Sequence, residues 1–137
     1  MQVQGKRLVA VSLIFAVALV YRLIYIQQFS RYPIFSILDI DQEYYHFWAK
    51  RIAAGDLMSG REVFEMTPLY AYMLGFFYKF VSTDIFTLKV VQSVAGSFSA
   101  VLIFFLAHRV FKSFAVAVVA GVTAAIYAPF VHYDNMV

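Results

Sequence analysis

Three apolar runs constrain this chain more than any other feature of its sequence. They cover about residues 8–29, 85–107 and 114–132. The first run is 22 residues long, which as a helix is about 33 Å and exceeds a bilayer core of about 30 Å. The chain is 63% hydrophobic and 14% charged, whereas a soluble domain is about half apolar and a quarter charged. We therefore expect an all-α integral membrane protein with three transmembrane helices.

The start of the first run has two interpretations. Lys6 and Arg7 precede it, and a basic start before an apolar run also describes a signal peptide. The small residues Ala16 and Ala18 resemble a cleavage step. Because the apolar run continues past them, we expect an uncleaved anchor.

A fourth apolar stretch, Pro68 to Val81, is shorter. It would form about 21 Å of helix, too little to cross a bilayer. It is rich in Tyr and Phe, which collect at membrane interfaces. We expect it to be a juxtamembrane helix lying flat.

The positions of the basic residues set the predicted topology. With Pro68–Val81 lying flat, Lys6 and Arg7 share the cytoplasmic side with Arg109 and Lys112, as the positive-inside rule requires. The N-terminus is then cytoplasmic and the loop 30–84 lies outside. No Lys/Arg stripe follows a helix face, so we expect no nucleic-acid partner.

All eight acidic residues fall on the predicted outer side. Seven belong to the loop 30–84 and the eighth closes the third run: Asp39, Asp41, Glu43, Asp56, Glu62, Glu65, Asp84 and Asp134. Acidic residues contribute little to topology, so orientation alone does not explain this grouping. Long loops with their own helical pattern often carry function.

The loop contains a second predicted amphipathic helix, Asp41 to Ala54. Asp39 is a candidate N-cap, Gln42 completes a capping-box spacing, and Gly55 supplies a stop. One face is apolar and suits contact with the membrane or the spans; it carries Tyr45, Trp48 and Ile52. The loop is therefore predicted to hold two juxtamembrane amphipathic helices.

Several motifs occur in an order that resembles a known family. They are Asp41-Gln42-x-x-Tyr45, Ala49, Ile52-Ala53-x-Gly55-Asp56, Phe64-Glu65-x-x-Pro68-Leu69-Tyr70, Arg109-Val110-Phe111 and Pro129-Phe130-x-x-Tyr133-Asp134. This order is similar to the start of GT-C fold glycosyltransferases of the protein mannosyltransferase type (family 39). Relatives of that family include bacterial enzymes that transfer aminoarabinose to lipid A. The resemblance covers essentially the whole chain and identifies it as the N-terminal part of a longer enzyme, inactive alone.

The resemblance implies an inverting transfer of a sugar from a polyprenyl-phosphate donor to a protein, lipid or glycan acceptor. It places the catalytic base at Asp41 and brings Glu65 into the same site, with Asp134 facing the same cavity. The family often has Glu where this chain has Gln42, with Glu43 one place later. Met66 replaces a phosphate-binding Lys of the aminoarabinose enzymes, so that contact is not carried over.

The chemistry fits these residue types, because an acceptor hydroxyl must lose a proton as it attacks the anomeric carbon. Gln42, Glu43 and Tyr45 are candidate substrate-binding residues. The phosphate leaving group favours Arg, Lys or a divalent cation, so Mg or Mn is a candidate cofactor, without a predicted ligand set. Besides the donor and acceptor, membrane lipid is an expected partner, in the cell (inner) membrane of a bacterium or archaeon.

Simpler interpretations of these residues stay open. Asp41 is also an ordinary first-turn acid, Glu65 a solvated loop acid, and Asp134 a polar residue at a span end. Arg22 lies in the outer part of the first run, where it either snorkels to the headgroups or pairs with a loop acid, or else binds the donor phosphate. The alternative function is a non-enzymatic polytopic protein, such as a transporter subunit or assembly factor.

Overall fold

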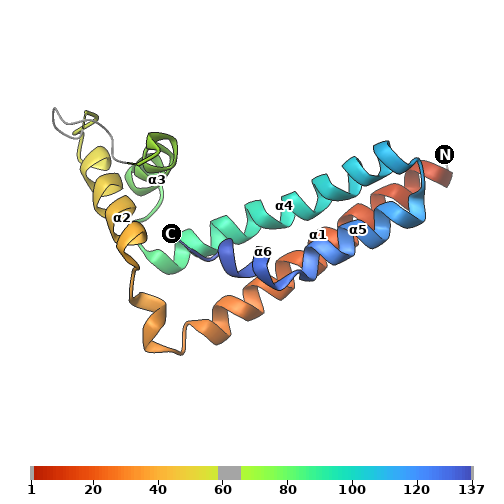
Figure 1. Cartoon of the computed structure of the whole chain (residues 1–137), viewed down its shortest axis with the longest axis horizontal. Coiled ribbons are helices and arrows are strands. Elements are labelled where there is room, and N and C mark those ends of the chain that lie inside the picture. The colour runs from red at the N-terminus through yellow and green to blue at the C-terminus, as the bar shows by residue number, and fades with distance from the viewer. Residues whose placement is uncertain (1, 59–65, 137) are drawn as a thin grey trace. The chain divides into compact units, whose positions relative to one another are not determined.

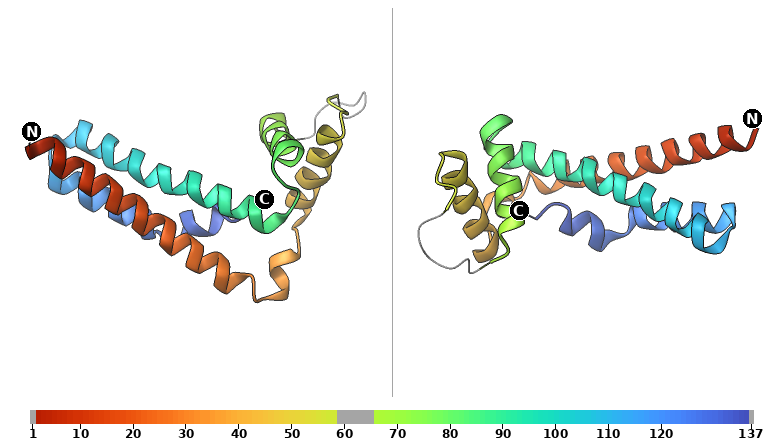
Figure 2. Two further views of the ribbon diagram at one scale, coloured as in Figure 1. Left: turned by 180° about the vertical axis from the view of Figure 1, so that it is seen from behind. Right: turned by 90° about the horizontal axis from the view of Figure 1, so that it is seen from above.

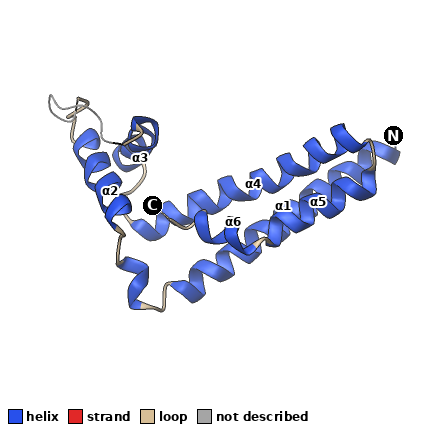
Figure 3. Cartoon of the chain, in the orientation of Figure 1, coloured by secondary structure: helices blue, strands red, loops and turns tan. Residues whose placement is uncertain are grey.

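The computed structural model describes residues 2–58 and 66–136, and these residues form helices without a strand (Figures 1 and 3). In order they are α1 (Gln2–Phe29), the 3-10 turn η1 (Pro33–Ser36), α2 (Ile40–Ala53), α3 (Pro68–Phe80), α4 (Ile85–Phe111), α5 (Phe114–Ile126) and α6 (Ala128–Tyr133). The chain divides into two compact units. The first comprises Met1–Phe29 and Lys89–Asn135, and the second comprises Ser30–Leu88 and the last two residues. The prediction of an all-helical fold is confirmed.

Two helices are long and apolar enough to cross a membrane. They are Gln4–Phe29, with a mean hydropathy of 2.3, and Ile85–Phe111, with 2.0. They correspond to the first two predicted spans, and both extend a few residues further than predicted. The third predicted span, 114–132, is not one helix: α5 has 13 residues, about 20 Å, and α6 follows after a break.

The break in the third apolar segment lies at Tyr127, whose backbone is extended (φ −66°, ψ 110°). Pro129 accounts for it. In a continuous helix the proline ring would clash with the carbonyl of Ala125 and could donate no hydrogen bond to it. Pro129 is tolerated instead in the first turn of α6, where the missing N–H costs nothing.

Small side chains allow the helices of the first unit to pack closely. Ala117, Gly121 and Ala125 are buried at four-residue spacing on α5, the small-xxx-small pattern of helix pairs in membranes. A Cβ at Gly121 would lie only 2.8 Å from Cδ1 of Ile14 on α1. Together with Phe104 of α4 these residues belong to one core, and Figure 2 shows the three helices side by side.

One end of the first unit is basic. Arg7 of α1 and Nε2 of His108 on α4 are 2.6 Å apart, which joins the beginning of α1 to the end of α4. A tight turn then leads into α5, with Lys112 in the left-handed region (φ 52°) and the Ser113 side chain accepting from the backbone N–H of Val116. The predicted cytoplasmic basic residues of both segments therefore lie together.

The second unit is built on the α2–α3 hairpin. The two helices predicted within the loop 30–84 are present, and their ends agree with the prediction to within one residue. Gly75 of α3 lies against Ile52 of α2, since a Cβ there would be 2.7 Å from Cγ2 of Ile52. Trp48 and Ile52 are 5% exposed and pack with Ala71. The apolar face of α2 therefore packs on α3, and Ala49 of α2 also belongs to a cluster with Leu88 in the first turn of α4. Contact of α2 with the membrane stays a prediction.

The predicted ends of α2 are formed in different ways. Gly55 follows the helix with φ 104°, as expected of a glycine stop. Asp39 occupies the N-cap position, but its side chain makes no capping hydrogen bond. The predicted capping box with Gln42 is therefore not formed.

Candidate functional site

The predicted catalytic base lies in the first turn of α2. Asp41 and Glu43 are exposed there, and Gln42 is half-buried. Among the residues that the structure describes, the Asp41 carboxylate has no hydrogen bond or ion pair. It is thus available to a substrate hydroxyl or to a cation.

The aromatic ring of Tyr45 lies one helical turn after Asp41 on α2. Its ring lies edge-on to Tyr70, with centroids 5.0 Å apart, and its hydroxyl lies 2.8 Å from Oγ1 of Thr67. Two helices therefore hold the ring in place, one turn from Asp41. Glu65 lies outside the described residues.

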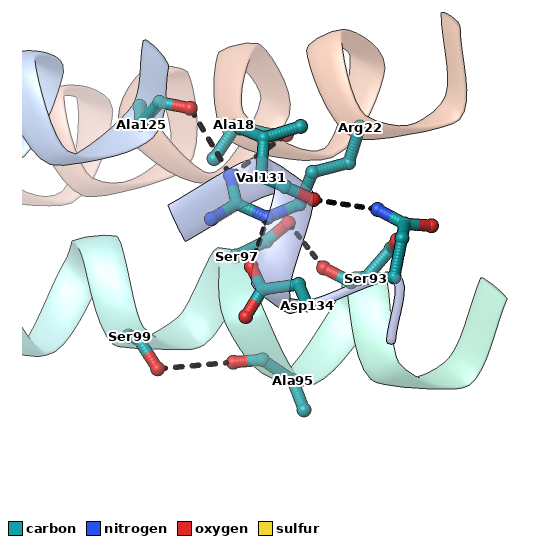
Figure 4. Close-up of polar contacts among 10 residues, drawn as sticks. Ala18, Arg22, Ser93, Ala95, Ser97, Ser99, Ala125, Val131 and Asp134 are labelled. Atoms are coloured by element: carbon teal, nitrogen blue, oxygen red, sulfur yellow. Dashed lines mark hydrogen bonds and ion pairs between the residues drawn. The ribbon is translucent and has the colours of Figure 1, made fainter. Parts of the chain in front are cut away.

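The other predicted site residues belong to the first unit, and the structure pairs them with each other. Nε of Arg22 on α1 donates to Oδ2 of Asp134 at 2.8 Å (Figure 4). The Arg22 side chain is 1% exposed and that of Asp134 is 26% exposed. A buried guanidinium needs such a partner, because an isolated charge in an apolar interior is strongly unfavourable. Arg22 is therefore buried instead of snorkelling, and it pairs with Asp134 and with no described acid of the loop 30–84.

The same guanidinium also donates a hydrogen bond to a backbone carbonyl at the break in the third apolar segment. Nη1 of Arg22 donates to the carbonyl of Ala125 at 3.0 Å and to that of Ala18 at 3.3 Å. Ala125 is the residue whose helical partner would have been the N–H of position 129, which proline lacks. Arg22 thus replaces the hydrogen bond that Pro129 removes and links α1 to both sides of the break.

Helix α4 makes room for the ion pair. A Cβ at Gly96 would lie 2.0 Å from Oδ2 of Asp134, so only glycine fits while the carboxylate keeps this position. Ser93 and Ser97 line the same part of α4 and are fully buried, and the Ser97 hydroxyl donates to the carbonyl of Ser93 at 2.7 Å (Figure 4). The ion pair therefore contacts all three apolar segments of the first unit.

Sequence reasoning weighed Arg22 and Asp134 separately and did not connect them with Pro129. A signal was present: Arg22 is the one charge inside the first run, and Asp134 is the one acid beyond the loop. Opposite charges on neighbouring apolar helices commonly pair. Pro129, four residues after Ala125, marks the carbonyl that needs a donor.

A buried polar pair also ties α2 to α3 in the second unit. Nδ1 of His46 and the hydroxyl of Tyr78 share a 2.6 Å hydrogen bond. Burial, with a smaller contribution from Lys50, lowers the pKa of His46, and burial together with Tyr70 raises the pKa of Tyr78 to about 12. Both groups are therefore neutral near pH 7 and serve to hold the hairpin together.

Two other described acids of the second unit, Asp84 and Asp56, have structural partners. Asp84 caps α4, accepting from the backbone N–H and the hydroxyl of Thr87 at 2.8 Å, and these bonds lower its pKa. Asp56 pairs with Arg51 at 2.8 Å on the surface. Within residues 2–58 and 66–136 no group of three or more His, Cys, Asp or Glu is placed to hold a metal ion.

Predicted site residues therefore occur as two groups, one in each unit: Asp41 with Gln42, Glu43 and Tyr45, and Arg22 with Asp134. The first group is open to a ligand and the second is engaged within the protein. Comparison of the chain with protein-family models, with curated proteins and with solved structures finds no match.

Proposed function

We propose that this chain is the N-terminal part of a membrane glycosyltransferase of the GT-C type that transfers a sugar from a polyprenyl-phosphate donor. The observation that carries the proposal is that the Asp41 carboxylate is exposed and has no partner among the described residues. This carboxylate is exposed at the head of α2 and unengaged among the described residues, whereas Asp56, Asp84 and Asp134 each have a partner. Asp39 is likewise exposed and makes no side-chain capping bond, so it provides the matched control.

The membrane placement is part of the proposal. Helices α1 and α4 cross the bilayer, and α5, the break and α6 together form the third crossing. The basic end of the first unit is cytoplasmic by the positive-inside rule. The loop 30–84, with α2 and α3, is then on the outer face, where a flipped lipid-linked sugar is available.

In the proposed reaction the Asp41 carboxylate accepts the proton of the acceptor hydroxyl. The hydroxyl oxygen forms a bond to the anomeric carbon from the face opposite the phosphate, and the carbon–oxygen bond to the phosphate breaks. The polyprenyl phosphate leaves with the bonding electrons, so the anomeric configuration inverts. Gln42, Glu43 and Tyr45 lie on the same or the next turn of α2 and would contact acceptor or sugar, with Glu65 in the same site.

The leaving phosphate requires a positive group. Arg22 is a poor candidate, because its Nε and Nη1 donors already serve Asp134 and Ala125. A divalent cation such as Mg or Mn, or basic residues elsewhere in the complete enzyme, would supply the charge. Arg22 is therefore assigned a structural role in this proposal.

One observation favours the alternative, a transporter subunit or another non-enzymatic membrane protein. A broken apolar helix with a buried ion pair at the break is a feature of transporter folds, where discontinuous helices surround the substrate site. Here the break is filled by Arg22 of the same chain. The two proposed functions are distinguished by whether the full-length protein transfers sugar and whether this transfer needs Asp41.

The test compares Asp41→Asn with the matched control Asp39→Asn in the full-length protein. Membranes carrying each variant would be incubated with a panel of radiolabelled polyprenyl-phosphate sugars and an endogenous acceptor. Loss of a general base typically costs about 10²–10⁴-fold in rate, so the rate of transfer should fall by that factor in Asp41→Asn, while Asp39→Asn should retain most of it. Transfer by Asp41→Asn at the wild-type rate would reject the assignment, and no transfer by any variant or wild type would favour the alternative.

Topology has its own test, because the chain contains no cysteine. Met58 is 74% exposed beyond the end of α2, and Met58→Cys should react with an impermeant thiol reagent added to intact cells. Gln4→Cys, at the beginning of α1, should react only after the membrane is opened. The reverse labelling pattern would invert the proposed orientation and exclude chemistry on the outer face.

A further inference from the structure

A groove runs along the surface of the first unit between α1 and α5. Its volume is about 790 Å³, within the range of about 300–1,000 Å³ that small-molecule sites occupy. Val9, Leu13 and Val17 form one wall on α1, and Val118 and Val122 form the other on α5. The groove is therefore an apolar channel parallel to the helices.

The polar end of the groove lies at the basic end of the unit. Gly5 and Lys6 line it there, and a Cβ at Gly5 would find no atom within 4 Å, so the mouth is open. From Gly5 to Val17 the groove follows about 18 Å of helix. That length is a little more than half of the bilayer core of about 30 Å, which is the depth of one leaflet.

The basic residues at the mouth of the groove indicate which kind of ligand it would bind. Lys6 at the mouth is accompanied at this end of the unit by Arg7, Arg109 and Lys112. The one acid of this unit, Asp134, lies at the other end, where it pairs with Arg22, about 22 Å along α1 from Arg7. An apolar channel of leaflet depth that ends in uncompensated positive charge matches an anionic headgroup followed by an acyl chain.

We propose that this groove binds an anionic phospholipid, with its phosphate against Lys6 and one acyl chain between α1 and α5. The inference rests on the membrane placement proposed above but not on glycosyltransferase activity. The site is distinct from any donor site at Asp41, because the basic end belongs to the cytoplasmic leaflet in that placement. A protein helix is a poorer occupant, since it would have to bring an acid to Lys6.

Native mass spectrometry of the purified full-length protein would test the site, with phosphatidylglycerol titrated against phosphatidylcholine. Val9→Trp should fill the groove and remove most of the phosphatidylglycerol binding. Leu8→Trp is the matched control, because Leu8 is 69% exposed and does not line the groove. Val122→Phe repeats the test from the opposite wall.

The headgroup contact is tested separately. Lys6→Gln should weaken phosphatidylglycerol binding about fivefold, the effect of losing one basic contact worth about 1 kcal/mol at a membrane surface. Arg109→Gln, which removes an exposed charge at the same end but outside the groove, should change binding less. Circular dichroism of each variant would show that the helices are retained.

Three outcomes would overturn the proposal. Equal binding of phosphatidylcholine would show that charge does not select the ligand. Equal losses in Val9→Trp and Leu8→Trp would show that the groove is not the site. A change of oligomeric state in Val9→Trp, with lipid binding unaltered, would assign the groove to a second copy of the chain. None of these outcomes depends on whether sugar transfer is observed.

Discussion

The two units of this chain are both helical but are held together by different side chains. The first unit packs mainly alanines, Gly121 and a few aliphatic residues, with the single fully buried ring of Phe104, between its described helices, and its outward faces are apolar. The second unit packs rings, with Trp48 and Tyr78 buried between short helices. Small residues suit helices that cannot gain from hydrophobic burial because lipid surrounds them, whereas bulky rings suit a hairpin at an interface.

The two units also differ in where their ion pairs lie. The first unit buries its ion pair, Arg22 with Asp134, inside the helices. The second places its ion pair on the surface, where the Arg51 and Asp56 side chains are 55% and 43% exposed. Charge thus serves internal architecture in one unit, and in the other it is left accessible, Asp41 included. This difference is the reason why the proposed sugar transfer is assigned to the second unit.

The largest expected effect comes from breaking the buried ion pair. Arg22→Leu leaves the Asp134 carboxylate unpaired and the Ala125 carbonyl without its donor, so it should cost about 3–5 kcal/mol of stability. Asp134→Asn keeps the bond to Ala125 and should cost less. Thermal unfolding in detergent micelles would measure both. Arg51→Ala, which breaks the exposed pair, should cost at most about 1 kcal/mol.

A double variant sharpens this contrast. Arg22→Leu with Asp134→Leu leaves no buried charge, so it should recover part of the loss caused by Arg22→Leu alone. If Arg22→Leu and Arg51→Ala were equally mild, the ion pair would not hold the first unit together.

An intermediate effect is expected from the glycines that allow close approach. Gly96→Ala places a methyl group on Asp134, and Gly75→Ala places one on Ile52. Overpacking costs about 1–3 kcal/mol, against a gain of about 1 kcal/mol in helix propensity. Both variants should be destabilised in thermal melts, whereas Gly5→Ala, which has open space around it, should not be.

The two clashes differ in origin. Gly96→Ala should become harmless when Asp134 is also replaced by Ala, because the clashing carboxylate is gone. Gly75→Ala should stay destabilising in that background. Additive losses of Gly96→Ala and Asp134→Ala would mean that the glycine does not make room for the carboxylate.

The smallest effect is a pH dependence confined to the second unit. The pKa of His46 is lowered in the folded state from its ordinary value of 6.5, so the unfolded state binds the proton more readily. The stability of this unit should be full above about pH 6.5 and decrease as the pH falls below that value. Fluorescence of Trp48, the single tryptophan, would report unfolding of this unit, and His46→Gln should flatten the dependence.

Local rules predicted most of the helices. The apolar stretch that starts at Pro68 predicted α3, and Gly55 predicted the end of α2. The apolar runs predicted α1 and α4, because lipid-spanning helices need only length and hydropathy. The same rules predicted one continuous helix over 114–132, which was wrong, because the hydropathy of this segment does not reveal that a proline interrupts the helix. The apolar face of α2 was predicted correctly, but its packing on α3 was not, because an apolar face does not specify what covers it.

The sequence by itself determined where the chain is helical and apolar, where its basic residues gather along the chain, and which acids, Asp41 among them, follow the first span. Those properties depend on neighbours within a few residues. Only the tertiary structure decided that Arg22 meets Asp134, 112 residues away, at the carbonyl released by Pro129 and opposite Gly96. Such a contact depends on how three helices pack. A buried charge needs a partner of opposite charge, and only the packing decides which residue lies close enough to be that partner.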